Sequence, residues 1–244
     1  MKKNVLLFTA VMILALFLTG CETKIIESDD ENINTINVQG SATVAAAPDE
    51  ANILIRIETR ADTAQRAEDD ARAKANQVMG ALKQHGVKEA DIQTTQFSLN
   101  PQWDWTEEGQ KFRGYMLYHV MKVTSKDVEN TGKLVDAAIT AGANAIDSVQ
   151  FTLSKEKRKD VFGEALQRAA EEAESKAQSL GSTLGITVGK PTQIMEQNFN
   201  YIPYDYRGGV AMAETADAKM MPPTPISPQE VEVTATVQVN FLIE

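Results

Sequence analysis

Two histidines are the first candidates for catalytic or metal-binding chemistry, because the chain holds only His85 and His119. His85 precedes Gly86 at the end of an alanine-rich segment, where an imidazole suits the negative end of a helix dipole. His119 lies in an apolar segment that predicts a strand. A metal or acid–base site would need both rings to converge with carboxylates or a thiol. We therefore predict capping for His85, packing for His119, and no catalytic residue, metal or cofactor.

The motifs of the common enzyme classes do not occur in the sequence. There is no Gly-x-Ser-x-Gly, His-Glu-x-x-His, Walker-type or Gly-x-Gly-x-x-Gly pattern. Ser41 follows Gly40 in a predicted strand without a base at a recognisable spacing. A hydrolase is the weakest of the functional hypotheses, and it would depend on His119 or Asp49.

Aromatic residues gather in two segments without a clear period. Trp103 and Trp105 flank Asp104 within residues 101–113, which we predict to be a loop. Two exposed tryptophans would form a protein interface or a ligand platform. The alternative is that they cover a sheet edge.

The second aromatic segment spans residues 199–227 and contains Tyr201, Tyr204 and Tyr206. Unperiodic loops of this length are usually functional or disordered. Its methionines could bind Cu(I), but their spacing is irregular. Two hypotheses remain for this segment: it contacts a partner or a second subunit, or it is a mobile loop.

The first 20 residues have the pattern of an export signal. Lys2 and Lys3 give a basic start, and an apolar run follows from residue 5 to residue 18. This run is short for a membrane span, which needs about 20 apolar residues. We therefore predict a signal peptide over residues 1–20.

The run ends in Leu18-Thr19-Gly20-Cys21, which resembles the lipobox of bacterial lipoproteins. The resemblance implies cleavage before Cys21 and lipid on its thiol, so that two or three acyl chains attach the protein to a membrane. Cys21 is the only cysteine, which excludes a disulfide framework. The polar and acidic residues 21–35 predict a flexible tether, and residues 36–244 predict the folded domain.

The charge of the chain limits the partners. The net charge is -10, and removal of residues 1–20 takes away two lysines and no acid. This balance argues against nucleic acid and against binding of anionic lipid through basic patches. We expect a cell-envelope location, on the periplasmic or outer-membrane side, with the membrane reached through lipid on Cys21.

The periodicity of the folded part alternates between that of strands and that of helices. Two alternating runs, 36–47 and 51–60, are separated by Pro48-Asp49-Glu50 and predict a β-hairpin. The further predicted strands are 92–99, 115–124, 146–153, 189–197 and 230–242, and the predicted helices are 61–85, 127–141 and 157–184. For the first helix, Asp62 or Thr63 is the expected N-cap.

An internal similarity supports a layered fold. Residues 92–99 resemble residues 146–153, and each copy follows a predicted helix and a glycine. We predict an α+β fold with a mainly antiparallel sheet, about three helices packed on one side, and a repeated helix–Gly–strand unit. The last strand, 230–242, could lie at a sheet edge.

The order of these elements resembles the SIMPL domain family, which includes YggE-like periplasmic proteins and related outer-membrane antigens. The residues that carry the resemblance are Ile36 to Val44, Pro48 to Ala51, Gly114 to Val123, Leu134 to Asn144 and Ala169 to Gly185. The resemblance implies an envelope α/β domain, homo-oligomers, and in places a link to oxidative-stress tolerance. It supplies no catalytic residues. The Cys21 motif departs from relatives that have a plain signal peptide, which puts their assembly geometry in doubt for this chain.

The sequence thus supports two main hypotheses. The first is a non-enzymatic envelope lipoprotein that self-associates through sheet edges and long loops. The alternative is a binding module for a small molecule or peptide that uses Trp103 and Trp105 together with Tyr201, Tyr204 and Tyr206.

Overall fold

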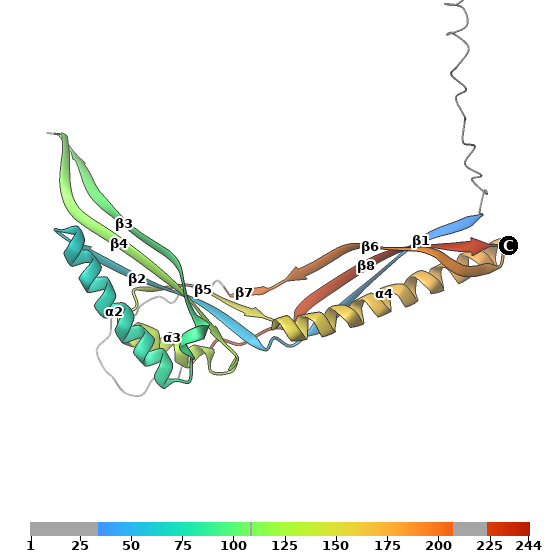
Figure 1. Ribbon diagram of the computed structural model, residues 1–244, viewed down its shortest axis with the longest axis horizontal. Coiled ribbons are helices and arrows are strands. Elements are labelled where there is room, and N and C mark those ends of the chain that lie inside the picture. Colours follow the sequence, from blue (N-terminus) through green and yellow to red (C-terminus); the bar gives the residue numbers. More distant parts are fainter. Residues whose placement is uncertain (1–33, 108, 207–223) are drawn as a thin grey trace, which may run out of the picture. The chain divides into compact units, whose positions relative to one another are not determined.

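The computed structural model describes residues 34–107, 109–206 and 224–244, which form two antiparallel sheets with helices (Figure 1). Cys21 and the predicted leader lie outside the described residues. The predicted α+β fold is confirmed, but the strands form two sheets instead of one. Within the described ranges, no helix combines the length and the hydropathy needed to cross a bilayer.

The five-stranded sheet has the strand order β3-β4-β2-β5-β7. Its elements are β2 (Glu50–Ala61), α2 (Ala64–Gln84), β3 (Ile92–Thr106), β4 (Gly109–Ser125), α3 (Thr131–Thr140), β5 (Ala145–Thr152) and β7 (Tyr204–Tyr206), with a 3-10 turn η1 (Glu89–Asp91) before β3. From β2 to β5 the chain follows the β-α-β-β-α-β arrangement of ferredoxin-like domains. Each helix connects two strands that are separated in the sheet by a third strand, and this explains the internal similarity of residues 92–99 and 146–153.

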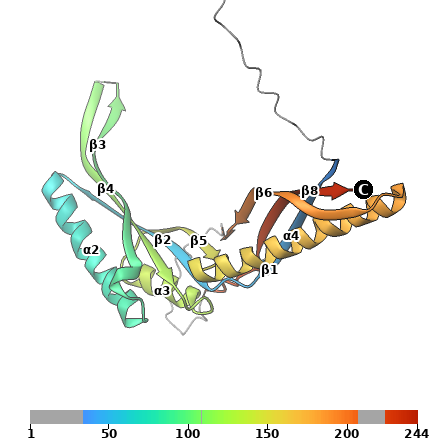
Figure 2. The ribbon, with the colours of Figure 1, turned by 45° about the vertical axis from the view of Figure 1, so that its right-hand side comes forward.

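The three-stranded sheet has the order β1-β8-β6. Its strands are β1 (Thr35–Ala46), β6 (Val188–Ile202) and β8 (Val231–Ile243), and the 30-residue helix α4 (Lys155–Leu184) covers one of its faces (Figure 2). β1 and β8 pair over their whole length, from Thr35 opposite Leu242 to Ala46 opposite Val231.

The predicted hairpin of residues 36–60 is therefore wrong, although both of its strands exist. Among the described residues, β1 pairs only with β8, whereas β2 pairs with β4 and β5 in the other sheet. Pro48 and Asp49 connect two sheets instead of turning the chain back on itself. Alternation of apolar residues shows that a strand has a buried face, but it does not identify the neighbouring strand.

The last strand is also placed differently from the prediction. β8 lies in the centre of its sheet, between β1 and β6, and not at an edge. Val231, Val233 and Ala235 on its inner face are fully buried or nearly so. A strand that pairs on both sides cannot offer a free edge for subunit contacts.

Two predicted loops and one predicted helix differ clearly in extent from the structure. Residues 101–113 belong to β3 and β4 and are not a loop. The first residues of the predicted loop 199–227 extend β6 and form β7, and residues 207–223 lie outside the described residues. The helix predicted over 127–141 is shorter and spans only α3.

Small residues let α4 lie very close to β1. Its buried face is formed by residues four positions apart, Val161, Ala165, Ala169, Ala173, Ala177 and Gly181. A Cβ atom on Gly40 of β1 would stand 1.9 Å from the Ala169 carbonyl oxygen and 2.7 Å from the Ala173 nitrogen. Only glycine fits at this crossing of backbone on backbone.

Charged side chains of α4 close part of the free edge of β1. The Lys176 Nζ donates to the Gln39 carbonyl at 3.0 Å, and the Ser41 backbone N–H donates to the Glu172 carboxylate. Glu172 and Lys176 also form an ion pair at 2.8 Å. Groups that could hydrogen-bond to another strand are thus used within the domain.

The five-stranded sheet packs its apolar core against α2 and α3. Ile53, Ile55 and Ile57 alternate along β2 with no exposed surface, and Val78 and Leu82 of α2 pack in the same cluster. The helix begins at the predicted cap, because the Thr63 hydroxyl accepts from the Arg66 N–H at 3.3 Å.

Replacement of Phe151 by alanine is expected to remove about 3–5 kcal/mol of stability, because Phe151 of β5 is fully buried in this core. Phe97→Ala, in the same sheet, serves as the control and should cost less than about 1 kcal/mol, because Phe97 is 56 % exposed. Urea unfolding of both variants measures the difference. Equal losses would contradict this assignment of core and surface.

Candidate functional site

The strands β3 and β4 continue beyond the sheet as a two-stranded arm. The pairing of β4 with β2 ends at Tyr115, opposite Ala61, and the described residues between 102 and 114 pair only with one another. Gly114 marks the base of the arm, with a φ of +106°, and a Cβ there would lie 2.5 Å from the Ala61 carbonyl oxygen. An isolated two-stranded hairpin is only marginally stable in water. The arm therefore needs either internal contacts or a partner.

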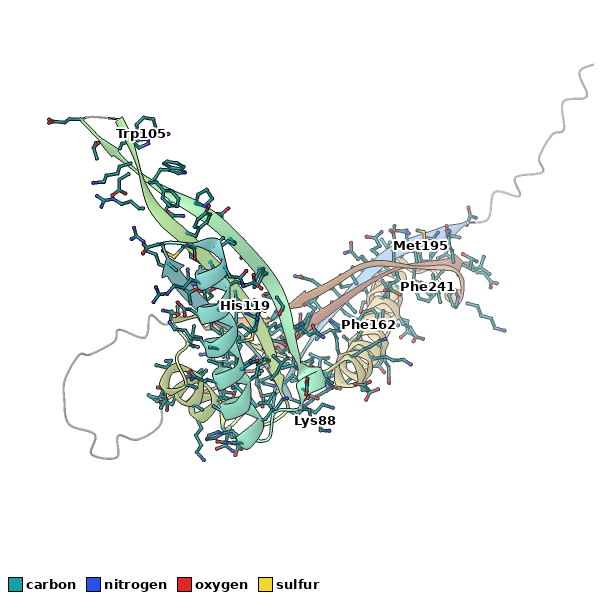
Figure 3. The ribbon with its side chains drawn as sticks, turned by 60° about the vertical axis from the view of Figure 1, so that its left-hand side comes forward. Lys88, Trp105, His119, Phe162, Met195 and Phe241 are labelled. Atoms are coloured by element: carbon teal, nitrogen blue, oxygen red, sulfur yellow. The ribbon has the colours of Figure 1, made fainter. Side chains whose placement is uncertain are left out.

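One face of the arm is aromatic. Trp103 lies opposite Phe112 with ring centroids 5.1 Å apart, and Phe112 contacts Tyr115 at 5.4 Å. All three rings lie on the same face of the sheet as α2. Leu117 of β4 packs with buried residues of α2 on this face, and Tyr115, two residues earlier in β4, packs against the same cluster. Trp105 lies at the end of the arm (Figure 3).

The aromatic face continues along the edge strand as an apolar stripe. We use this name for the alternate β3 residues Phe97, Leu99, Pro101, Trp103 and Trp105. The exposed fractions are 56 % for Phe97, 51 % for Trp103 and 81 % for Trp105. Contiguous exposed apolar residues of this kind mark interaction surfaces.

The opposite face of the arm is charged. The Arg113 Nε donates to Asp104 Oδ2 at 2.6 Å, and Lys111 is the cross-strand partner of Asp104. At the base, the Arg60 Nη2 donates to the Arg113 carbonyl oxygen at 3.1 Å and ties the arm to β2. The arm is therefore amphipathic, with water on one face and an uncovered apolar surface on the other.

Tyr201 has a structural position in β6. Its hydroxyl accepts from the Leu153 N–H at 2.8 Å, and the Arg158 guanidinium lies 5.5 Å from the centre of its ring. The backbones of Tyr204 and Tyr206 pair with Phe151 and Val149 of β5, while their side chains lie outside the described part of the structure.

The two predicted aromatic loops do not form one surface in the five-stranded sheet. β3, which carries Trp103 and Trp105, is one edge of that sheet, and β7, which carries Tyr204 and Tyr206, is the opposite edge. The arm alone is therefore the candidate site.

The two histidines are held by different residues. His85 is the C-cap residue of α2, and its Nδ1 lies 3.0 Å from the Ala81 carbonyl oxygen. His119 hydrogen-bonds to the Thr94 hydroxyl at 3.0 Å and packs against the Phe97 ring, and burial lowers its pKa. Among residues 34–107, 109–206 and 224–244, no three His, Cys, Asp or Glu side chains gather in a way that could hold a metal ion.

Asp49 lies where the chain passes between the two sheets. Its carboxylate accepts from the Ser154 N–H at 2.7 Å, and Ser154 is the N-cap of α4. Burial acts to raise the pKa of Asp49, but the hydrogen bonds from Ser154 and the charge of Lys157 outweigh it and leave the pKa lowered. These contacts describe a structural carboxylate that links β2 to α4.

The fold and the site define a class of α+β protein with an exposed aromatic arm. The SIMPL family model, described as a protein of unknown function (DUF541), matches residues 36–241, and the chain belongs to this family.

Curated relatives agree with this assignment. The chain is 28 % identical over 142 residues to the uncharacterized protein YggE of Escherichia coli (strain K12), covering 56 % of this chain and 58 % of the relative. It is 24 % identical over 166 residues to the 26 kDa periplasmic immunogenic protein of Brucella melitensis, covering 66 % of each. The chain thus spans less than two thirds of the length of these relatives, and their names mention no enzymatic activity.

Proposed function

We propose that this chain is a non-enzymatic cell-envelope protein that is anchored by lipid on Cys21 and self-associates through the β3–β4 arm. The periplasmic name of the Brucella relative and the Leu-Thr-Gly-Cys sequence support the location and the anchor. The family resemblance alone carries the link to envelope or oxidative stress tolerance.

The observation that carries the proposal is the uncovered aromatic face of the arm. Each aromatic side chain offers about 150–250 Å² of surface. With exposed fractions of 51 %, 81 % and 40 % for Trp103, Trp105 and Phe112, complete coverage would yield about 8 kcal/mol at about 25 cal/mol per Å². Association itself costs about 4–15 kcal/mol. The free energy gained by covering one aromatic face is therefore close to the cost of association. A symmetric dimer covers the aromatic faces of two arms at once, which doubles the gain.

Light scattering after size exclusion on residues 22–244 tests the proposal. The unmodified protein should exceed the monomer mass, and Trp103→Ser with Trp105→Ser should return it to the monomer, because the largest exposed rings are lost. Lys111→Ser is the matched control, since Lys111 lies on the charged face of the same arm. A strict monomer at high concentration, or an unchanged mass in the double variant, would contradict self-association through the arm.

The alternative is a module that binds a small molecule or an apolar peptide on the same stripe. It is favoured by the exposure of Trp105, which is 81 %. In that case the protein stays monomeric, and its tryptophan fluorescence shifts when the ligand is added. The two readouts therefore distinguish the candidates.

A further inference from the structure

The face of the three-stranded sheet opposite α4 carries mainly uncharged hydrogen-bonding side chains. α4 packs on the side of Val237, Val239 and Phe241, so the alternate residues of each strand lie on the other side. Met195 marks this open side in Figure 3, away from α4 and Phe162. The uncharged hydrogen-bonding residues of this polar face are Asn37, Gln39, Ser41 and Thr43 of β1, Thr234, Thr236, Gln238 and Asn240 of β8, and Gln193 and Gln197 of β6. The register also places Met195 and Ile202 of β6 and Glu232 and Leu242 of β8 on this face.

Five amides on the polar face form one continuous hydrogen-bonded chain. Gln197 donates to Gln238, and Gln238 donates to Asn37 at 2.8 Å. Asn37 donates to Asn240, and Asn240 donates to Gln193 at 3.0 Å. The four bonds run in one direction, from Gln197 as the first donor to Gln193 as the last acceptor, so they polarise one another and hold the side chains in fixed positions.

The chain leaves hydrogen-bonding capacity for a ligand. A side-chain amide has two N–H donors and an oxygen with two acceptor sites. In these bonds the interior members Asn37, Gln238 and Asn240 each use one N–H and one acceptor site. Each can therefore offer a further donor and a further acceptor at fixed positions. Side chains that are already ordered pay less entropy when a ligand binds.

The absence of charge on this face selects the chemistry of the ligand. The chain as a whole carries a net charge of -10, yet between Thr234 and Asn240 the outward residues of β8 are all uncharged. Glu232, at the beginning of β8, is the charged residue of this face of the strand. A polyanion or polycation would leave its charges without partners here. A polymer of neutral groups that both donate and accept hydrogen bonds would instead find a partner for each of its groups.

We propose that the polar face binds a neutral glycan that carries hydroxyl and N-acetyl groups. Hydroxyls both donate and accept, and an acetamido group matches a side-chain amide in the same two roles. Met195, which is 41 % exposed between the amides, can contact the apolar side of a sugar ring. The proposal stands on residues of the three-stranded sheet and does not depend on self-association through the arm.

Retention of the full-length chain on chitin beads, in mild detergent, tests the proposal. We expect retention above that on uncoated beads, with little change between low and high salt, because no ion pairs are involved. Asn37→Ala with Gln238→Ala interrupts the amide chain and should weaken retention at least about tenfold, because hydrogen bonds from both side chains to the ligand are lost. Gln178→Ala, on the exposed surface of α4, is the control, and the beads should retain this variant as fully as the unmodified protein.

A second variant covers the case in which the alanine variant loses its fold. Gln238→Glu keeps the size of the side chain, removes its N–H donors and places a charge on the face. This variant should also lose retention. Its melting temperature shows whether the domain is folded. No retention of the unmodified protein on chitin would overturn the proposal. So would full retention of folded Gln238→Glu.

Discussion

Gly40→Ala is expected to destabilise the protein by about 3 kcal/mol, although it adds only one methyl group. The new Cβ would meet the Ala169 carbonyl oxygen at 1.9 Å and the Ala173 nitrogen at 2.7 Å. Both atoms belong to the backbone of α4, so they cannot turn aside as a flexible side chain would. The helix must move away from β1, and the contacts of Ala169, Ala173 and Val38 are weakened together. Thermal unfolding of the variant measures the loss.

Gly163→Ala is the matched control for this substitution. Gly163 lies in α4 as well, but a Cβ there meets nothing within 4 Å. Alanine in an open helix position should therefore stabilise the protein by about 1 kcal/mol, through helix propensity alone. Opposite signs for the two variants would establish that close packing, and not the change of residue type, decides the effect. A neutral Gly40→Ala would mean that α4 and β1 are not in contact as described.

Cys21→Ser should abolish attachment to the membrane. The substitution removes the only thiol of the chain and with it the proposed site of acylation. Each buried methylene of an acyl chain contributes about 0.8 kcal/mol, so the loss of two or three chains removes nearly all of the membrane affinity. We expect the variant to lose labelling by a clickable fatty acid and to move from the membrane fraction to the soluble fraction.

Thr23→Ala, two residues after the cysteine, is the control for this experiment and should behave as the unmodified protein. Membrane retention of Cys21→Ser without label would show that something other than lipid holds the protein. That result would refute the proposal of a lipid anchor while leaving membership of the SIMPL family unaffected.

The helices could be predicted well because their signals are local. The stripe from Val161 to Gly181, four residues apart, and the Gly185 at the end of α4 both follow from neighbouring residues. Thr63 and His85 cap α2 in the same way. The choice of strand partners could not be predicted, because β1 pairs with β8 at the far end of the chain. A Pro-Asp-Glu turn between alternating runs is compatible with a hairpin and with a crossing between sheets.

The arm was not predicted because Pro101, Asp104 and Gly109 are typical of loops, although the two tryptophans are common in strands. A signal was nevertheless present, because Phe97, Leu99, Pro101, Trp103 and Trp105 keep a strict period of two. Proline is tolerated in an edge strand, since its missing N–H can face solvent. A prediction that followed this alternation past Pro101 would have extended the strand to Thr106. The amide chain of the polar face could not be foreseen, because it joins three strands that are distant in the sequence.

The pairing of β1 with β8 has a consequence for how the domain assembles during synthesis. A chain leaves the ribosome from its N-terminus, so Thr35 emerges long before its partner Leu242. The strands from β2 to β5 are complete by Thr152 and have their neighbours nearby. Non-local pairings form slowly, since a long loop must close first. We therefore expect the ferredoxin-like part, from β2 to β5, to fold while β1 is still unpaired. The three-stranded sheet should form only after β8, at the end of the chain, has been synthesised.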